Sequence, residues 1–158
     1  MKTLYALVLL CQFAWANVPT EQLITQYQTI HEAMASNNVE IAAEQAKAFL
    51  EVVAPWLEEN AEDPAKEQMV AAQTGATELA LANTQAMASL TFGHLSRGVV
   101  EFIRSKSPLH SQWQLFYCPM YEQSGADYGH WVQPMGIKIA NPYFGAAMLT
   151  CGSKKKWA

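Results

Sequence analysis

Residues 87–103 read MASLTFGHLSRGVVEFI, and their apolar side chains recur at the spacing of an α-helix. Apolar residues three or four positions apart place one face of a helix against a core. Three similar stripes precede this segment, between residues 20 and 80. The four stripes are Leu23, Tyr27, Ile30 and Met34; Ile41, Ala42, Gln45, Phe49, Val52, Val53 and Trp56; Met69, Ala72, Ala76, Leu79 and Ala80; and Met87, Leu90, Thr91, His94, Leu95, Val99, Phe102 and Ile103. Four helices with short connections predict a mainly α fold, an antiparallel helical bundle.

Capping and breaking residues indicate where these helices begin and end. Pro55 is expected to bend or end the second helix, because its ring excludes a regular backbone hydrogen bond. Asp63-Pro64 is typical of a helix start. Asn83 or Thr84 can cap the fourth helix, although one long bent helix over the third and fourth stripes is an alternative.

After residue 106 the composition changes, and glycine and aromatic residues become dense. The segments that fit short strands are Leu115–Cys118, Trp131–Gln133 and Ile137–Ile139, with a turn at 124–127 and a helical turn at 146–151. A segment this small does not fold alone. We therefore expect residues 107–158 to form a small C-terminal β/loop cap that packs its aromatics on the bundle. Residues 17–158 would then be a single domain.

The first sixteen residues resemble a cleavable signal peptide. A positive start at Lys2 is followed by the uncharged run Leu4–Leu10 and by Ala14-Trp15-Ala16. This order predicts cleavage after Ala16 and export to the periplasm. The apolar run is too short to span a bilayer, and no later segment is a better candidate, so no transmembrane span is expected in the mature protein.

Cleavage removes Lys2, which lowers the count of Lys plus Arg from ten to nine against fourteen Asp plus Glu, a net charge of −5. The acids concentrate in the helical region, and the chain ends in the basic run Lys154–Lys156. Because no basic stripe is interleaved with aromatics, the sequence does not indicate nucleic-acid binding.

Four sulfur side chains occur in two short motifs. Cys118 and Met120 lie two residues apart and would share one face of an extended segment; Met148 and Cys151 lie three apart and would share one face of a helical turn. Soft thiolate and thioether ligands select soft cations, above all Cu(I). A disulfide between Cys118 and Cys151, closing a loop of roughly 33 residues, is the alternative, since exported cysteine pairs usually bond.

The histidines give one further candidate ligand, and no enzyme motif is found in the sequence. His94, on the fourth stripe, is the only histidine considered as an auxiliary ligand, and His31, off the first stripe, is expected to be solvated. The sequence contains no nucleophile elbow, glycine-rich phosphate loop or carboxylate pair near a histidine, so an enzyme is not predicted.

Several motifs, in order along the chain, resemble the domain of unknown function 3347 family. They are Phe116–Met120, Trp131-Val132-Gln133, Ile139–Gly145 and Met148–Gly152. The resemblance implies a periplasmic helical bundle with a sulfur-rich cap, a domain also found fused to membrane-fusion proteins of copper and silver efflux systems. It implies metal ligands at Cys118, Met120, Met148 and Cys151. It also implies a structural frame made of Pro119, Trp131, Asn141, Pro142, Tyr143, Gly145 and Gly152.

Two functions follow from these observations. The first is an exported protein that binds Cu(I) or Ag(I) in heavy-metal handling or efflux, with an efflux-system or other periplasmic protein as partner. The alternative is a structural or protein-interaction domain closed by a Cys118–Cys151 disulfide. In either case the segment 141–145 is expected to act as a clamp that positions Met148 and Cys151, without itself binding metal.

Overall fold

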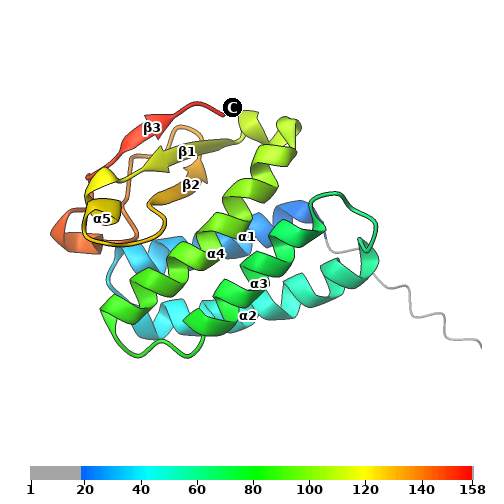
Figure 1. Cartoon of the computed structure of the whole chain (residues 1–158), viewed down its shortest axis with the longest axis horizontal. Coiled ribbons are helices and arrows are strands. Elements are labelled where there is room, and N and C mark those ends of the chain that lie inside the picture. The colour runs from blue at the N-terminus through cyan, green and yellow to red at the C-terminus, as the bar shows by residue number, and fades with distance from the viewer. Residues whose placement is uncertain (1–18, 158) are drawn as a thin grey trace, which may run out of the picture.

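The computed structural model describes residues 19–157, and the segment interpreted as a signal peptide lies outside them. Four long helices pack side by side, with a small antiparallel sheet along one side of the bundle (Figure 1). The predicted mainly α fold with a C-terminal β/loop cap is therefore confirmed. The helices are α1 (Thr20–Ala35), α2 (Val39–Glu59), α3 (Lys66–Leu79) and α4 (Gln85–Ser105). Within this described part, no helix is long and apolar enough to cross a membrane.

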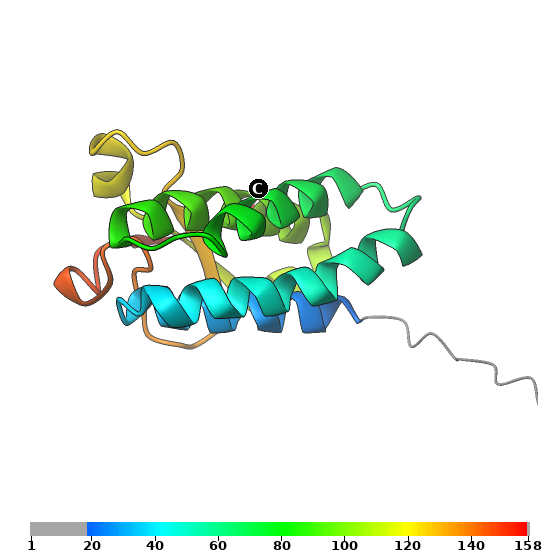
Figure 2. The same ribbon diagram turned by 90° about the horizontal axis from the view of Figure 1, so that it is seen from below.

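The predicted stripes form the bundle core, with exceptions at the helix starts. Large side chains such as Tyr27, Phe49 and Trp56 are fully buried between the helices. Ile41, Met87 and Leu90 were expected to face inward but are 38–45 % exposed. These three lie in the first two turns of α2 and α4, at the end of the bundle that Figure 2 shows beside the α1–α2 connection.

The third and fourth stripes form two separate helices, because the chain turns between them. Thr84 is the N-cap residue of α4, and its Oγ1 accepts a hydrogen bond from the Met87 N–H at 3.2 Å. The alternative of one long bent helix is therefore wrong. Pro55, by contrast, does not end α2, which continues to Glu59. Its last turn is held by the buried Trp56, whose ring packs edge-on against Phe102 of α4 at 5.4 Å.

Helices α3 and α4 approach each other at two glycines. A Cβ atom added to Gly75 would lie 2.1 Å from the backbone nitrogen of Leu95. A Cβ added to Gly98 would lie 2.4 Å from the backbone nitrogen of Ala72. Each distance is far shorter than any van der Waals contact, so both positions require glycine for the two backbones to touch.

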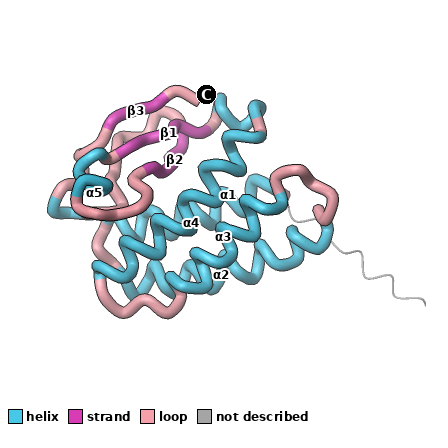
Figure 3. The backbone as a smooth tube through the Cα atoms, viewed as in Figure 1, coloured by secondary structure: helices cyan, strands magenta, loops and turns pink. Residues whose placement is uncertain are grey.

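The C-terminal cap follows α4 through a short 3-10 helix (Figure 3). Its elements are η1 (Ser107–Ser111), β1 (Trp113–Tyr117), α5 (Pro119–Gln123), β2 (His130–Pro134), η2 (Gly145–Ala147) and β3 (Ser153–Lys155). The central strand is β1, paired antiparallel with β2 on one side and with β3 on the other.

Two parts of the cap differ from the sequence-based expectation. Residues 137–139 do not form a strand. The buried Gln133 side chain instead holds this segment, since it donates to the Lys138 carbonyl and accepts from the Ala140 N–H, both at 3.0 Å. The basic C-terminal run, conversely, contributes Lys154 and Lys155 to the edge strand β3. All three residues of β3 are exposed, so no alternation of apolar residues marks this strand in the sequence.

Hydrogen bonds and rings join the cap to both α1 and α4. Ser96 of α4 donates from its Oγ to the His130 carbonyl at 2.9 Å and also contacts the Tyr27 hydroxyl of α1 at 2.8 Å. Tyr143 of the cap donates to the same His130 carbonyl at 2.6 Å, and its ring packs edge-on against Phe92 of α4. The cap is therefore part of the same core as the bundle.

Candidate metal centre

Three of the four predicted sulfur side chains come together at the end of the cap. The Cys118 and Cys151 sulfurs lie 3.4 Å apart, and the Cys151 thiol donates to the Met120 sulfur at 3.6 Å. Both cysteines are free thiols. Met148 is half-buried, and its hydrogen bonds are those of its backbone, including the 2.9 Å bond from the Cys151 N–H to its carbonyl.

Cys118 is held rigidly where β1 passes into α5. Its backbone N–H donates to the Gly129 carbonyl at 2.9 Å, and the residue is completely buried. Pro119 occupies the first position of α5, where its missing N–H costs no helical hydrogen bond. The segment after Cys118 is therefore helical, and the expected extended geometry for Cys118 and Met120 is wrong. Met120, 45 % exposed on the first turn of α5, still reaches Cys151.

Cys151 is positioned by Asn141. The Asn141 side chain is completely buried, and its Nδ2 donates to the Cys151 carbonyl at 2.7 Å. Its Oδ1 accepts hydrogen bonds from the backbone N–H groups of Tyr143 and Phe144 at 2.8 and 3.1 Å. One amide side chain thus links the turn that follows it to the backbone of a thiol residue ten positions later.

Two glycines allow close packing around this segment. Gly145 has a left-handed φ of 51°, and a Cβ there would overlap the Asn37 side chain that follows α1. Gly152 has a φ of 141°, and a Cβ there would lie 2.7 Å from the buried ring of Trp131. The residue after Cys151 therefore fits against the sheet only without a side chain.

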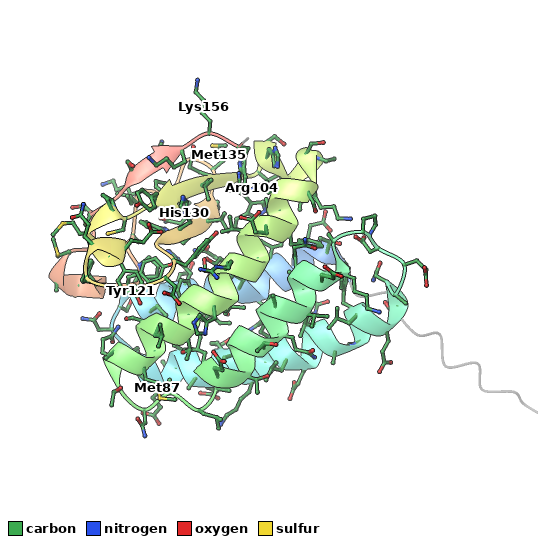
Figure 4. All side chains as sticks on the ribbon, viewed as in Figure 1. Met87, Arg104, Tyr121, His130, Met135 and Lys156 are labelled. Atoms are coloured by element: carbon green, nitrogen blue, oxygen red, sulfur yellow. The ribbon has the colours of Figure 1, made fainter. Side chains whose placement is uncertain are left out.

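Of the two aromatic residues in the 141–145 segment, Tyr143 faces the interior and Phe144 is half-buried. Tyr143 is 3 % exposed, and its ring stacks on Tyr121 of α5 at 4.1 Å between centroids. The preceding Pro142 is buried as well. Figure 4 shows Tyr121 beneath α5, on the side that faces α4. Because this stack joins the segment to α5, the elements that carry Cys118, Met120 and Cys151 are packed together.

Burial raises the pKa of the Cys151 thiol above its usual value, and the hydrogen bond with Cys118 adds to the increase. The thiol is therefore protonated near neutral pH. A cation bound there must displace this proton, since the thiolate is the form that ligates metals.

The two histidines discussed for the sequence have different surroundings. His94 of α4 pairs through Nδ1 with the Glu78 carboxylate of α3, and its role as an auxiliary ligand remains a prediction. His31 was expected to be solvated, which is wrong: it is 1 % exposed and hydrogen-bonded to the Ala140 carbonyl at 2.8 Å. The helical stripe did not identify His31 because it faces the cap, whereas the stripe marks residues that face the other helices.

Asn141→Ala is expected to lower the free energy of unfolding by about 2 kcal/mol, because it removes three hydrogen bonds and leaves the buried Tyr143 N–H without an acceptor. Urea denaturation of the reduced protein measures this change. Asn83→Ala, at an exposed asparagine in the α3–α4 connection, is the matched control and should be nearly neutral. Equal stability of Asn141→Ala and the wild type would contradict a clamp at this position.

No protein-family model, curated protein or solved structure matches the chain. The resemblance to the domain of unknown function 3347 family therefore stays a prediction. The fold and the site define the class of protein: a four-helix bundle whose C-terminal cap carries a close, unbridged pair of cysteines. Among residues 19–157, no group of three or more His, Cys, Asp and Glu side chains is placed to hold a metal ion.

Proposed function

We propose that the protein binds a soft monovalent cation, Cu(I) or Ag(I), with Cys118, Cys151 and Met120 as ligands. The observation that supports the proposal is the convergence of two thiols and a thioether within 3.4 and 3.6 Å. Soft sulfur donors favour Cu(I), whereas a thioether is a poor ligand for Zn(II) or for hard cations. The protein would be a binding protein and not an enzyme.

The spacing of the sulfurs fits such an ion after a small expansion. With metal–sulfur bonds of about 2.3 Å, three sulfurs in a triangle around a cation stand roughly 4 Å apart. The Cys118–Cys151 and Cys151–Met120 distances are a few tenths of an ångström shorter. Rotation of the exposed Met120 side chain can supply part of this expansion without moving the buried Cys118. Met148 is then a candidate fourth ligand only if its side chain turns towards Cys151.

The gradient of exposure across the three sulfurs supports a role in taking up or passing on the ion. Cys118 is fully buried, Cys151 is half-buried, and Met120 is 45 % exposed. An incoming ion would meet Met120 first and Cys118 last. Together with the signal peptide predicted at residues 1–16, this arrangement suits heavy-metal handling in the periplasm, with an efflux-system or other periplasmic protein as donor or acceptor.

Titration with Cu(I) against a competing chelator tests the proposal on the reduced protein. We expect Cys118→Ser and Cys151→Ser each to weaken Cu(I) binding by about a hundredfold or more, because even outer residues around metals cost roughly 10–100-fold when removed. Met120→Leu should weaken binding about tenfold, since it removes one neutral ligand and keeps the side-chain volume.

Met135→Leu is the matched control for Met120→Leu. Met135 is 48 % exposed and follows β2 at Pro134, which pairs with Trp113 at the end of β1 distant from Cys118. Figure 4 shows its side chain by the sheet, away from α5. The control should bind Cu(I) as the wild type does. Equal affinity of the wild type and the Cys118→Ser/Cys151→Ser double variant would refute the proposed function.

The 3.4 Å between the thiols also supports a second candidate, a structural or protein-interaction domain closed by a Cys118–Cys151 disulfide. Mass spectrometry of protein isolated from the periplasm separates the two candidates. A bonded pair, with no Cu(I) bound after reduction, would favour the structural domain.

A further inference from the structure

The two thiols lie only 3.4 Å apart, within reach of a disulfide bond. A disulfide needs sulfurs about 2.05 Å apart, and rotation of the cysteine side chains can close the remaining gap from 3.4 Å. The backbone on both sides is held by hydrogen bonds, from Cys118 to Gly129 and from Asn141 to Cys151. The pair is therefore kept together whether or not it is bonded.

The three sulfurs differ in hydrogen bonding and in exposure. The Met120 thioether has no hydrogen, so Cys151 donates to it. The Cys118 and Cys151 thiols are also within hydrogen-bond distance, and either can be the donor. Cys151 is also the accessible thiol, whereas Cys118 has no exposed surface. A dissolved oxidant can therefore reach Cys151 and cannot reach Cys118.

We infer that Cys118 and Cys151 form a reversible dithiol–disulfide couple that closes the metal site when it is oxidised; this inference rests on the proposed function. The oxidant is a small external disulfide, RSSR. The Cys151 thiolate attacks one of its sulfurs, which forms a mixed disulfide at Cys151 and releases one RSH after protonation. The Cys118 thiolate then attacks the Cys151 sulfur and releases the second RSH. The protein loses two electrons and two protons, and RSSR is reduced to two RSH.

Oxidation and metal binding compete for the same two sulfurs. The disulfide removes both thiolate ligands and leaves only the Met120 thioether, which cannot hold a cation alone. By linkage, a cation that binds only the dithiol form protects it. An ion present at ten times its dissociation constant should shift the dithiol-to-disulfide ratio about tenfold towards the dithiol, equivalent to about 30 mV in midpoint potential.

The experiment equilibrates the folded protein in mixtures of glutathione and glutathione disulfide, with and without Ag(I) bound to the protein. Free thiols are then alkylated, and peptide mass spectrometry reads each cysteine separately, so that Cys11 of the leader does not interfere. We expect a Cys118–Cys151 disulfide that forms in oxidising mixtures, opens in reducing mixtures and forms about tenfold less when Ag(I) is added at ten times its dissociation constant.

Two single variants test the assigned order of attack. Cys118→Ser should accumulate glutathione at Cys151, because no second thiol resolves the mixed disulfide. Cys151→Ser should leave Cys118 unmodified in the folded protein and modified only in denaturant. The reverse pattern would overturn the assignment of Cys151 as the attacking thiol.

The remaining outcomes separate this inference from the proposed function. Thiols that stay free in every mixture while Ag(I) binds would overturn the couple and leave metal binding intact. A disulfide that excess glutathione cannot open would also overturn it, in favour of a permanent cross-link. The disulfide could also form reversibly and be unaffected by Ag(I). If titration of the reduced protein then shows that Ag(I) binds, the competition between oxidation and metal binding is wrong. If titration shows no Ag(I) binding, the proposed function itself is wrong.

Discussion

Gly75→Ala and Gly98→Ala should each destabilise the protein by about 3 kcal/mol or more. The added methyl group would meet backbone atoms of the facing helix, at 2.1 Å from Leu95 and 2.4 Å from Ala72. Overpacking of a rigid core costs about 1–3 kcal/mol, occasionally more, and backbone cannot rotate aside as a side chain can. Alanine has a helix propensity about 1 kcal/mol more favourable than that of glycine, and the cost of the overlap exceeds this gain.

Gly93→Ala is the matched control, because it makes the same change within α4. A Cβ at Gly93 would lie 3.4 Å from the Tyr128 carbonyl oxygen and 3.8 Å from the Tyr143 ring, which are ordinary contacts. The variant should be neutral or slightly more stable. Denaturation in urea, followed by circular dichroism, compares the three variants. If Gly75→Ala and Gly98→Ala were as stable as Gly93→Ala, the close approach of α3 and α4 would be wrong.

His31 should make the protein sensitive to acid. Burial lowers the pKa of His31 from 6.5 to about 4, although the hydrogen bond to Ala140 opposes the shift. Between these two values the unfolded chain binds a proton that the folded protein excludes, so stability is complete above pH 6.5 and is lost as the pH falls towards 4. A shift of this size corresponds to about 3 kcal/mol.

The neighbours of His31 explain why it stays neutral. Its Nε2 donates to the Ala140 carbonyl, so the neutral ring has its lone pair on Nδ1, which faces the Gln28 side-chain amide at 3.3 Å. The same Gln28 nitrogen donates to the Glu32 carboxylate, which keeps a donor pointed at Nδ1. A proton on Nδ1 would place two donors face to face.

Urea denaturation between pH 7 and pH 4 measures this dependence. His31→Gln keeps a neutral side chain that can donate to Ala140, and it should lose most of the acid sensitivity. Some should remain, because burial also lowers the pKa of His130. Equal pH dependence in His31→Gln and the wild type would contradict a neutral buried His31.

The helices could be predicted from the sequence because helical periodicity is a local signal. Phe92, Leu95, Val99 and Phe102 face the core because each lies one turn or nearly one turn from the next. Residues that do not follow the prediction are those whose burial depends on a distant part of the chain, which local periodicity does not reveal. His31 lies off the stripe of α1 because it faces a loop more than a hundred residues later in the chain.

The candidate site could be predicted in part. Both the metal site and the disulfide considered for the sequence require the two cysteine segments to meet, and Cys118 and Cys151 lie 3.4 Å apart. The helical start at Pro119 could have been read from the rule that proline favours the first helical position, which would have replaced the extended geometry assumed for Met120. Asn141 could be expected to hold backbone groups, but its bond to the Cys151 carbonyl depends on tertiary packing that no local pattern encodes.

The order of the strands has a consequence for how the chain folds. The long helices pack mainly against their neighbours in sequence, whereas β1 must pair with β3, some forty residues further along. Contacts between distant residues form more slowly because a longer loop must close first. We therefore expect the bundle to form early and the pairing of β3, which fixes the chain directly after Cys151, to come last. Until that late step, a newly made molecule has its helices in place while its two thiols are still apart and open to unwanted partners.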